Sequence, residues 1–167
     1  MKRIIFVLQC CLLLTGLAGC DPAVKMAGEY SYKLSGKVTI DNVDYTLSNE
    51  QGTMDLLRKT DGDVLLTFSQ LRGGVCTAEA EINDTLLTLY PFERTVDITF
   101  TIPDTVSIGG IENIRDKEVT ETFDVEVTGT GTLYKETIVF DLYFNGESQS
   151  SDAHLTGENI LMVAKKN

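Results

Sequence analysis

The sequence predicts an all-β protein, an antiparallel up-and-down barrel of about eight to ten strands. Apolar and polar residues alternate with a period of two in most segments after residue 28, turn-forming pairs separate these segments, and helical spacing of apolar residues is almost absent. Sequential antiparallel strands with one wet face close most economically as a barrel. A two-sheet β-sandwich, whose strands would show the same alternation, is the alternative.

The first expected strands show the alternation clearly. Residues 30–40 carry apolar or small side chains on even positions and lysine, serine and threonine on odd ones, which indicates one long strand with one buried face. A short piece at 43–47 follows, and another segment begins at residue 54. Asp61-Gly62 is expected to form a tight hairpin turn, because a type I′ turn needs positive φ at both central positions.

The remaining strands continue the same pattern, and residues 96–102 alternate most strictly. In chain order, the expected strands cover residues 64–68, 76–82, 87–89, 96–102, 119–133, 138–144 and 154–163. The longest of these must bend, and Gly129 and Gly131 on its inner face are where it can bend. Lys135-Glu136 is expected to form a tight connection to the next strand.

Residues 103–117 are long for a loop in a compact domain. They carry four branched apolar residues and a Gly109-Gly110 pair that would serve as a hinge or a hairpin tip. Long loops of this kind are often lids or binding loops. A plain protruding hairpin is the other interpretation.

The chain begins with the residue order of an export signal. Lys2 and Arg3 precede an apolar run at residues 4–17, and the sequence Leu-Ala-Gly-Cys follows at residues 17–20. The apolar run is too short for a comfortable membrane span. This leader resembles the type II signal peptide of bacterial lipoproteins, in which a small residue before a cysteine closes the lipobox.

The resemblance implies a processed and anchored protein. Residues 1–19 would be the removed signal peptide, and Cys20 would become the acylated amino terminus. Residues 20–27 would form a lipid tether, and residues 28–167 would form one β-barrel domain. The expected location is therefore a membrane of the bacterial cell envelope, the outer rather than the inner, with the barrel facing the periplasm or the cell surface.

The part after the leader resembles the lipocalin-like, or calycin-type, β-barrels that some bacterial lipoproteins carry. The resemblance lies in Gly28-Glu29-Tyr30 at the start of the first long strand, in the glycine-bent residues 127–132 and in the strand order. Lipocalins usually have tryptophan in a Gly-x-Trp motif on this strand, whereas Tyr30 holds that place here. The resemblance implies a barrel that holds a small ligand.

Charge and the reactive side chains exclude several functions. The net charge of −11, with no basic stripe, disfavours binding to nucleic acid and flat adsorption on anionic lipid. If Cys20 carries lipid, Cys76 is the remaining thiol, and its place in an apolar row predicts a buried side chain. His154 is the only histidine, so neither a catalytic triad nor a zinc site can be assembled. We expect no enzyme activity, no metal and no cofactor.

Aromatic residues on the inferred inner faces are the candidate ligand site. They are Tyr30, Tyr32, Phe68, Phe100, Phe123, Phe140 and Phe144. Such a set either lines an apolar cavity or fills the barrel as its core. The leading hypothesis is a membrane-anchored, non-enzymatic binding module for a small apolar or amphipathic ligand. The alternative is a structural, accessory or inhibitory envelope lipoprotein that acts on another protein through its outer surface.

Overall fold

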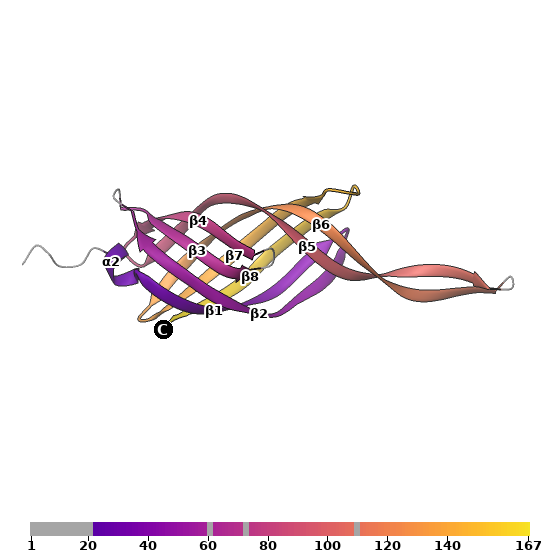
Figure 1. Ribbon diagram of the computed structural model, residues 1–167, viewed down its shortest axis with the longest axis horizontal. Helices are drawn as coiled ribbons and strands as arrows, with labels where there is room; N and C mark the ends of the chain where they lie inside the picture. The colour runs from indigo at the N-terminus through magenta and orange to yellow at the C-terminus, as the bar shows by residue number, and fades with distance from the viewer. Residues whose placement is uncertain (1–21, 60–61, 72–73, 109–110) are drawn as a thin grey trace, which may run out of the picture.

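The structure is a computed structural model that describes residues 22–59, 62–71, 74–108 and 111–167. Eight antiparallel strands form a closed barrel in sequential order (Figure 1). Their bounds are β1 Gly28–Ile40, β2 Val43–Arg58, β3 Val64–Leu71, β4 Gly74–Asn83, β5 Leu86–Ile108, β6 Ile111–Tyr134, β7 Thr137–Ser148 and β8 His154–Lys166. The predicted up-and-down barrel is confirmed, and the sandwich alternative is wrong. The predicted Asp61-Gly62 turn lies partly outside the described residues.

Two strands each combine two of the pieces that the sequence predicts. The pieces expected at 43–47 and from residue 54 belong to the single strand β2. The pieces expected at 87–89 and 96–102 belong to β5, which continues through a bulge where its register against β6 shifts between Leu89 and Phe92. A bulge lets a strand bend without ending, so an interruption of the alternation was wrongly interpreted as a break between strands.

The inner face of the barrel holds one continuous core. Residues on the inner rows are buried along most strands, and Cys76 lies on the inner row of β4, directly opposite Phe68 of β3. Gly131 faces Phe140 across β6 and β7, and a Cβ on Gly131 would lie 2.6 Å from the Phe140 ring. Glycine is therefore required there because the ring occupies the space that any side chain would need.

A short helix, α2 (Pro22–Met26), covers one end of the barrel. Ala23 and Met26 are buried, and the Tyr30 hydroxyl donates a hydrogen bond of 2.6 Å to the Met26 carbonyl. The Lys166 ammonium, at the end of the last strand, donates a second bond of 2.7 Å to the Ala27 carbonyl. Residues 22–27, the described part of the segment expected at 20–27 as a lipid tether, thus pack against the end of the barrel.

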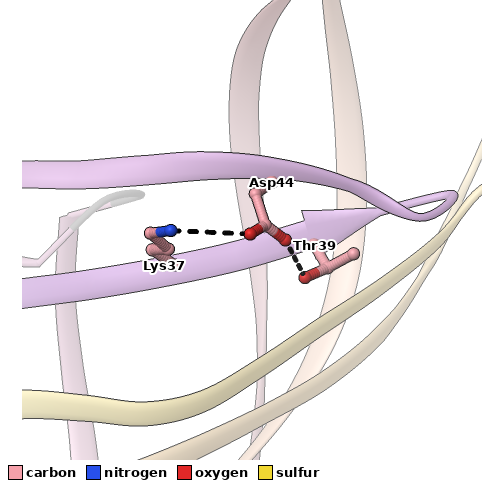
Figure 2. Close-up of polar contacts among 3 residues, drawn as sticks. All are labelled: Lys37, Thr39 and Asp44. Carbon is pink, nitrogen blue, oxygen red and sulfur yellow. Dashed lines mark hydrogen bonds and ion pairs between the residues drawn. The ribbon is translucent and has the colours of Figure 1, made fainter.

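The β1–β2 connection is a tight turn whose two central residues have positive φ, Asp41 at 47° and Asn42 at 70°. Beside this turn, the Asp44 carboxylate of β2 accepts a 2.9 Å hydrogen bond from the Thr39 hydroxyl of β1 and lies 3.6 Å from the Lys37 ammonium (Figure 2). These side chains are exposed, so the ion pair contributes little to stability.

The hinge or hairpin tip expected at Gly109-Gly110 lies outside the described residues. Residues 103–108 and 111–117 form paired strands rather than a loop or a lid. They extend β5 and β6 as a paired ribbon, in register from Ile102↔Lys117 to Ile108↔Ile111. Figure 1 shows this ribbon projecting beyond the barrel, at the end opposite α2. We call residues 102–108 and 111–117 the arm. Of the two interpretations of this segment, the protruding hairpin is confirmed.

The ladder between β2 and β3 ends at a group of side-chain contacts. The Tyr32 hydroxyl of β1 passes over Gly52 of β2 and donates a 2.8 Å hydrogen bond to the Ser69 carbonyl of β3. The Ser69 hydroxyl lies 3.2 Å from both the main-chain N–H and the carbonyl of Thr53. A side chain thus replaces a strand partner at the point where main-chain pairing of β2 with β3 stops.

The ladder between β4 and β5 is also short. It has four pairs, from Asn83↔Leu86 to Ala80↔Leu89, and Pro91, which has no N–H to donate, follows two residues later. Beyond Leu89, β5 pairs with β6 alone among the described residues. The edge of β5 that faces away from β6 is therefore without a strand partner from this point onward.

Gly52→Ala tests the contact between Tyr32 and Ser69. A Cβ at this position would lie 2.6 Å from the Tyr32 hydroxyl, so the variant must displace the ring and break its hydrogen bond. We expect a loss of about 2 to 3 kcal/mol in the free energy of unfolding, measured by urea denaturation. The neighbouring exposed Gln51→Ala should change it by less than about 0.5 kcal/mol. Equal effects of the two variants would contradict the contact.

Candidate functional site

The seven predicted site residues lie on the inner face, but most of them fill the barrel. Tyr30, Tyr32, Phe68, Phe123 and Phe140 are each no more than 1% exposed. The rings of Tyr32 and Phe68 pack edge to face with centroids 6.1 Å apart, as expected in a packed core. These residues act as core, the role that aromatic rows most often have in small barrels.

The other two predicted residues lie toward the arm. Phe100 is 9% exposed, and its ring contacts the ring of Tyr45 with centroids 5.3 Å apart. Tyr45 belongs to β2 and Phe100 to β5, two strands that do not pair with each other. This ring contact therefore closes the barrel wall from inside, where β3 and β4 do not reach. Phe144 of β7 is half-buried and lines a cavity.

The cavity has a volume of about 40 Å³ and lies on the arm side of the filled core. Its apolar lining consists of Leu34, Val38, Leu47, Val96, Ile98, Val125, Val127, Phe144 and Leu155. Cavities for drug-sized ligands have about 300 to 1,000 Å³. The interior therefore has room for a small apolar group or a few waters, and a fatty chain would require the walls to move apart.

Two charged residues also border this cavity, Glu50 of β2 and Arg94 of β5. Arg94 Nη1 donates a 3.3 Å hydrogen bond to the Cys76 sulfur. Both charged side chains influence the titration of Tyr32, so Tyr32, Glu50, Cys76 and Arg94 form one group inside the barrel wall. We call these four residues the inner polar cluster.

The sequence analysis missed Glu50 and Arg94, although a signal was present. Arg94 occupies the even row that continues as Val96, Ile98 and Phe100, and Glu50 precedes Gly52 and the inward Met54 in the same way. Each row was begun at its first clearly apolar residue. Extending the row of Val96 back by one inward position, and the row of Met54 back by two, would have identified a charged side chain at an inward position in each.

Burial raises the pKa of Tyr32 to about 12, with Cys76 and Glu50 adding to the shift and Arg94 opposing it. Burial also raises the pKa of the Cys76 thiol, and the Arg94 guanidinium opposes this shift. Cys76 is half-buried rather than fully buried. A thiol with a raised pKa is a poor nucleophile at neutral pH. The Cys76 thiol is therefore suited to packing in the barrel wall rather than to covalent chemistry.

The described residues contain no group of three or more His, Cys, Asp or Glu side chains placed to hold a metal ion. His154 begins β8 and is exposed, and its main-chain N–H donates a 3.1 Å hydrogen bond to the Asp41 carboxylate. Asp124 and Glu126 are exposed and lie on the outer face of β6. In the ranges that the structure describes, no helix is long and apolar enough to cross a membrane.

Comparisons with known proteins report little similarity. No protein-family model matches the chain, and no curated protein matches it at a significant level. Among solved structures, a redesigned β-barrel is similar, with 12% sequence identity and a TM-score of 0.36. That alignment covers 89% of this chain and 97% of the other.

Tyr32→Phe tests the buried phenol through pH. The folded chain keeps the Tyr32 proton up to a pH of about 12, whereas an unfolded tyrosine releases it near 10. The stability that the neutral phenol contributes is therefore complete below about pH 10 and is lost as the pH rises toward 12.

Near neutral pH, Tyr32→Phe should be less stable than the native chain by about 1 to 2 kcal/mol, because the Ser69 carbonyl loses its donor. Urea unfolding at a series of pH values should show the stability of the native chain falling by about 2 kcal/mol relative to the variant between about pH 10 and 12, so that the difference disappears or reverses. A difference that stays constant across that window would show that Tyr32 titrates as an exposed phenol.

Proposed function

We propose that the chain is a non-enzymatic, lipid-anchored protein of the bacterial cell envelope that binds another envelope protein through its outer surface. The single observation that carries this proposal is the arm, a two-stranded ribbon that leaves the barrel. The filled interior supports it, because a cavity of about 40 Å³ leaves the outer surface as the larger recognition area.

The arm has the properties of a binding element. Ile114 is 75% exposed and Ile102 is 36% exposed, and residues 114–118 of β6 are exposed without interruption. An isolated two-stranded ribbon is marginally stable in water and gains stability when another surface covers it. Exposed branched apolar residues on such a ribbon are suited to contact with a protein partner.

The position of the arm agrees with an anchor at Cys20. The lipid would precede α2, and α2 lies at the end of the barrel opposite the arm (Figure 1). The barrel would then act as a spacer that holds the arm away from the lipid surface. This arrangement suits an accessory protein on the outer membrane whose barrel faces the periplasm or the cell surface, and the net charge of −11 disfavours nucleic acid as a partner.

A second candidate function is the binding of a small apolar or amphipathic ligand inside the barrel. The apolar lining of the cavity favours it, with Glu50 and Arg94 at the border as polar contacts. The volume limits the ligand to a small group unless Tyr45 and Phe100 separate. Gentle purification followed by native mass spectrometry distinguishes the two functions, because a bound ligand adds a defined mass.

Cys20→Ala tests the anchor. We expect the variant to remain as an uncut precursor that incorporates no labelled fatty acid, because the cysteine is both the processing mark and the acylated residue in lipobox leaders. Metabolic labelling and gel mobility measure this. As a control, Cys76→Ala should be processed and labelled as the native chain is. Labelling of the Cys20→Ala variant would refute the anchor.

Site-specific photo-crosslinking in living cells tests docking through the arm. A photoreactive residue at Ile114 should form a crosslink to one protein partner, because this side chain is exposed on the arm. The same residue at Lys135, in the β6–β7 turn, is the control, because this exposed turn lies at the other end of β6. Crosslinks of equal yield and identity from both positions would contradict docking through the arm.

A further inference from the structure

We infer that the free edge of β5 between Pro91 and Pro103 is a site where an extended segment of a partner protein adds as a strand. The segment would carry lysine or arginine at alternate positions and apolar residues between them. The inference rests on the proposed docking function and identifies the chemistry of the partner. The observation behind the inference is that, among the described residues, no strand pairs with this edge of β5 beyond Leu89.

The direction of the main-chain groups follows from the register. In an antiparallel pair, alternate residues direct both their N–H and their C=O toward the partner strand. Pro103 has no N–H, so its place opposite Asp116 assigns the even residues of β5 to the ladder with β6. The odd residues Glu93, Thr95, Asp97, Thr99 and Thr101 therefore direct their main-chain groups toward the free edge.

The strand that carries this edge is tied to β6 by side-chain contacts as well as by the ladder. Three side-chain contacts join β5 and β6 at directly opposite positions, and they are Thr95 to Asp124 at 2.8 Å, Thr122 to Asp97 at 2.8 Å, and Thr99 to Thr120 at 2.9 Å. A partner strand would meet an ordered edge, which lowers the entropy cost of binding. Residues 93–101 span roughly 27 Å at the rise of an antiparallel strand.

The two prolines limit where a strand can add. Natural sheets protect exposed edges with proline and charge, because an open edge invites pairing. Here Pro91 and Pro103 lie at the ends of the edge, and no proline interrupts residues 92–102. The two prolines thus limit the length of an added strand but leave residues 92–102 open to pairing.

Charge selects the partner. Glu93 and Asp97 are exposed on the outer face beside the edge, in a chain of net charge −11. A second copy pairing about a two-fold axis at Asp97 would place two aspartates directly opposite each other, which is unfavourable. Basic residues at the same positions of a partner strand would be attracted instead. Its alternate residues would lie over the Tyr45–Phe100 contact and would be apolar.

The test uses the full chain and a synthetic peptide of about nine residues that alternates lysine and valine, with affinity measured by isothermal titration calorimetry. The control peptide is identical except that its lysine amides are N-methylated. The lysines share the outer face with the odd residues of β5, so their amides are those that would donate to the edge. We expect the control peptide to bind at least about tenfold more weakly, although it carries the same charge.

Thr99→Pro and Thr99→Val form the matched pair on the protein. Both lose the side-chain contact to Thr120, but only the proline removes the outward N–H. We expect Thr99→Pro to weaken binding by about tenfold or more and Thr99→Val by no more than about twofold. Thermal unfolding checks that both variants fold. Thr95→Pro provides a second edge variant if Thr99→Pro does not fold.

Equal binding of the two peptides, or of the two Thr99 variants, would overturn the edge site, because charge alone would then explain the affinity. Concentration-dependent dimerisation of the native chain that Thr99→Pro abolishes would also overturn it, since a second copy would be the occupant. In either case, crosslinking from Ile114 reports separately on docking through the arm. If the peptide binds as expected but Ile114 forms no crosslink, the proposed docking through the arm is contradicted while the edge site stands.

Discussion

Pro91 has no N–H to give to β4, and it lies beside the bulge at which β5 leaves that strand. Up to Leu89 every strand has two neighbours, and the closed ladder surrounds a core of fully buried aromatic rings. Beyond it, β5 pairs with β6 alone within the part of the chain that the structure describes. The bulge thus separates a closed, filled half of the molecule from a half that ends in the arm.

The interior changes where the strand pairing changes. On the α2 side of the bulge, the side chains of Tyr30, Phe68 and Phe140 fill the interior and leave no room for a ligand. On the arm side of the bulge, side chains form the wall between β2 and β5. They are the contact of Tyr45 with Phe100 and the inner polar cluster around Arg94. Side chains can close a barrel wall, but they do not satisfy the main-chain groups of the strands beside them. The free edge is a direct consequence.

The sequence was sufficient for the strand class and for the inward face of most strand segments, because alternation is a local property of each segment. It placed Phe123 and Cys76 on the inner face correctly. It was insufficient for the bulge in β5, which shifts the alternation between Leu89 and Phe92. It was also insufficient for the free edge and the cavity, because pairing partners and packed volume depend on residues far apart in the chain. Arg94 was missed because a charge at an inward position looks like the end of a strand.

Amide hydrogen exchange of the native chain, measured residue by residue along β5, tests the open edge most directly. We expect the amides of Thr95, Asp97 and Thr99 to exchange at least about a hundredfold faster than those of Val96 and Ile98, which donate to β6. Equal protection of odd and even residues would contradict the open edge, because it would mean that another segment already pairs with β5.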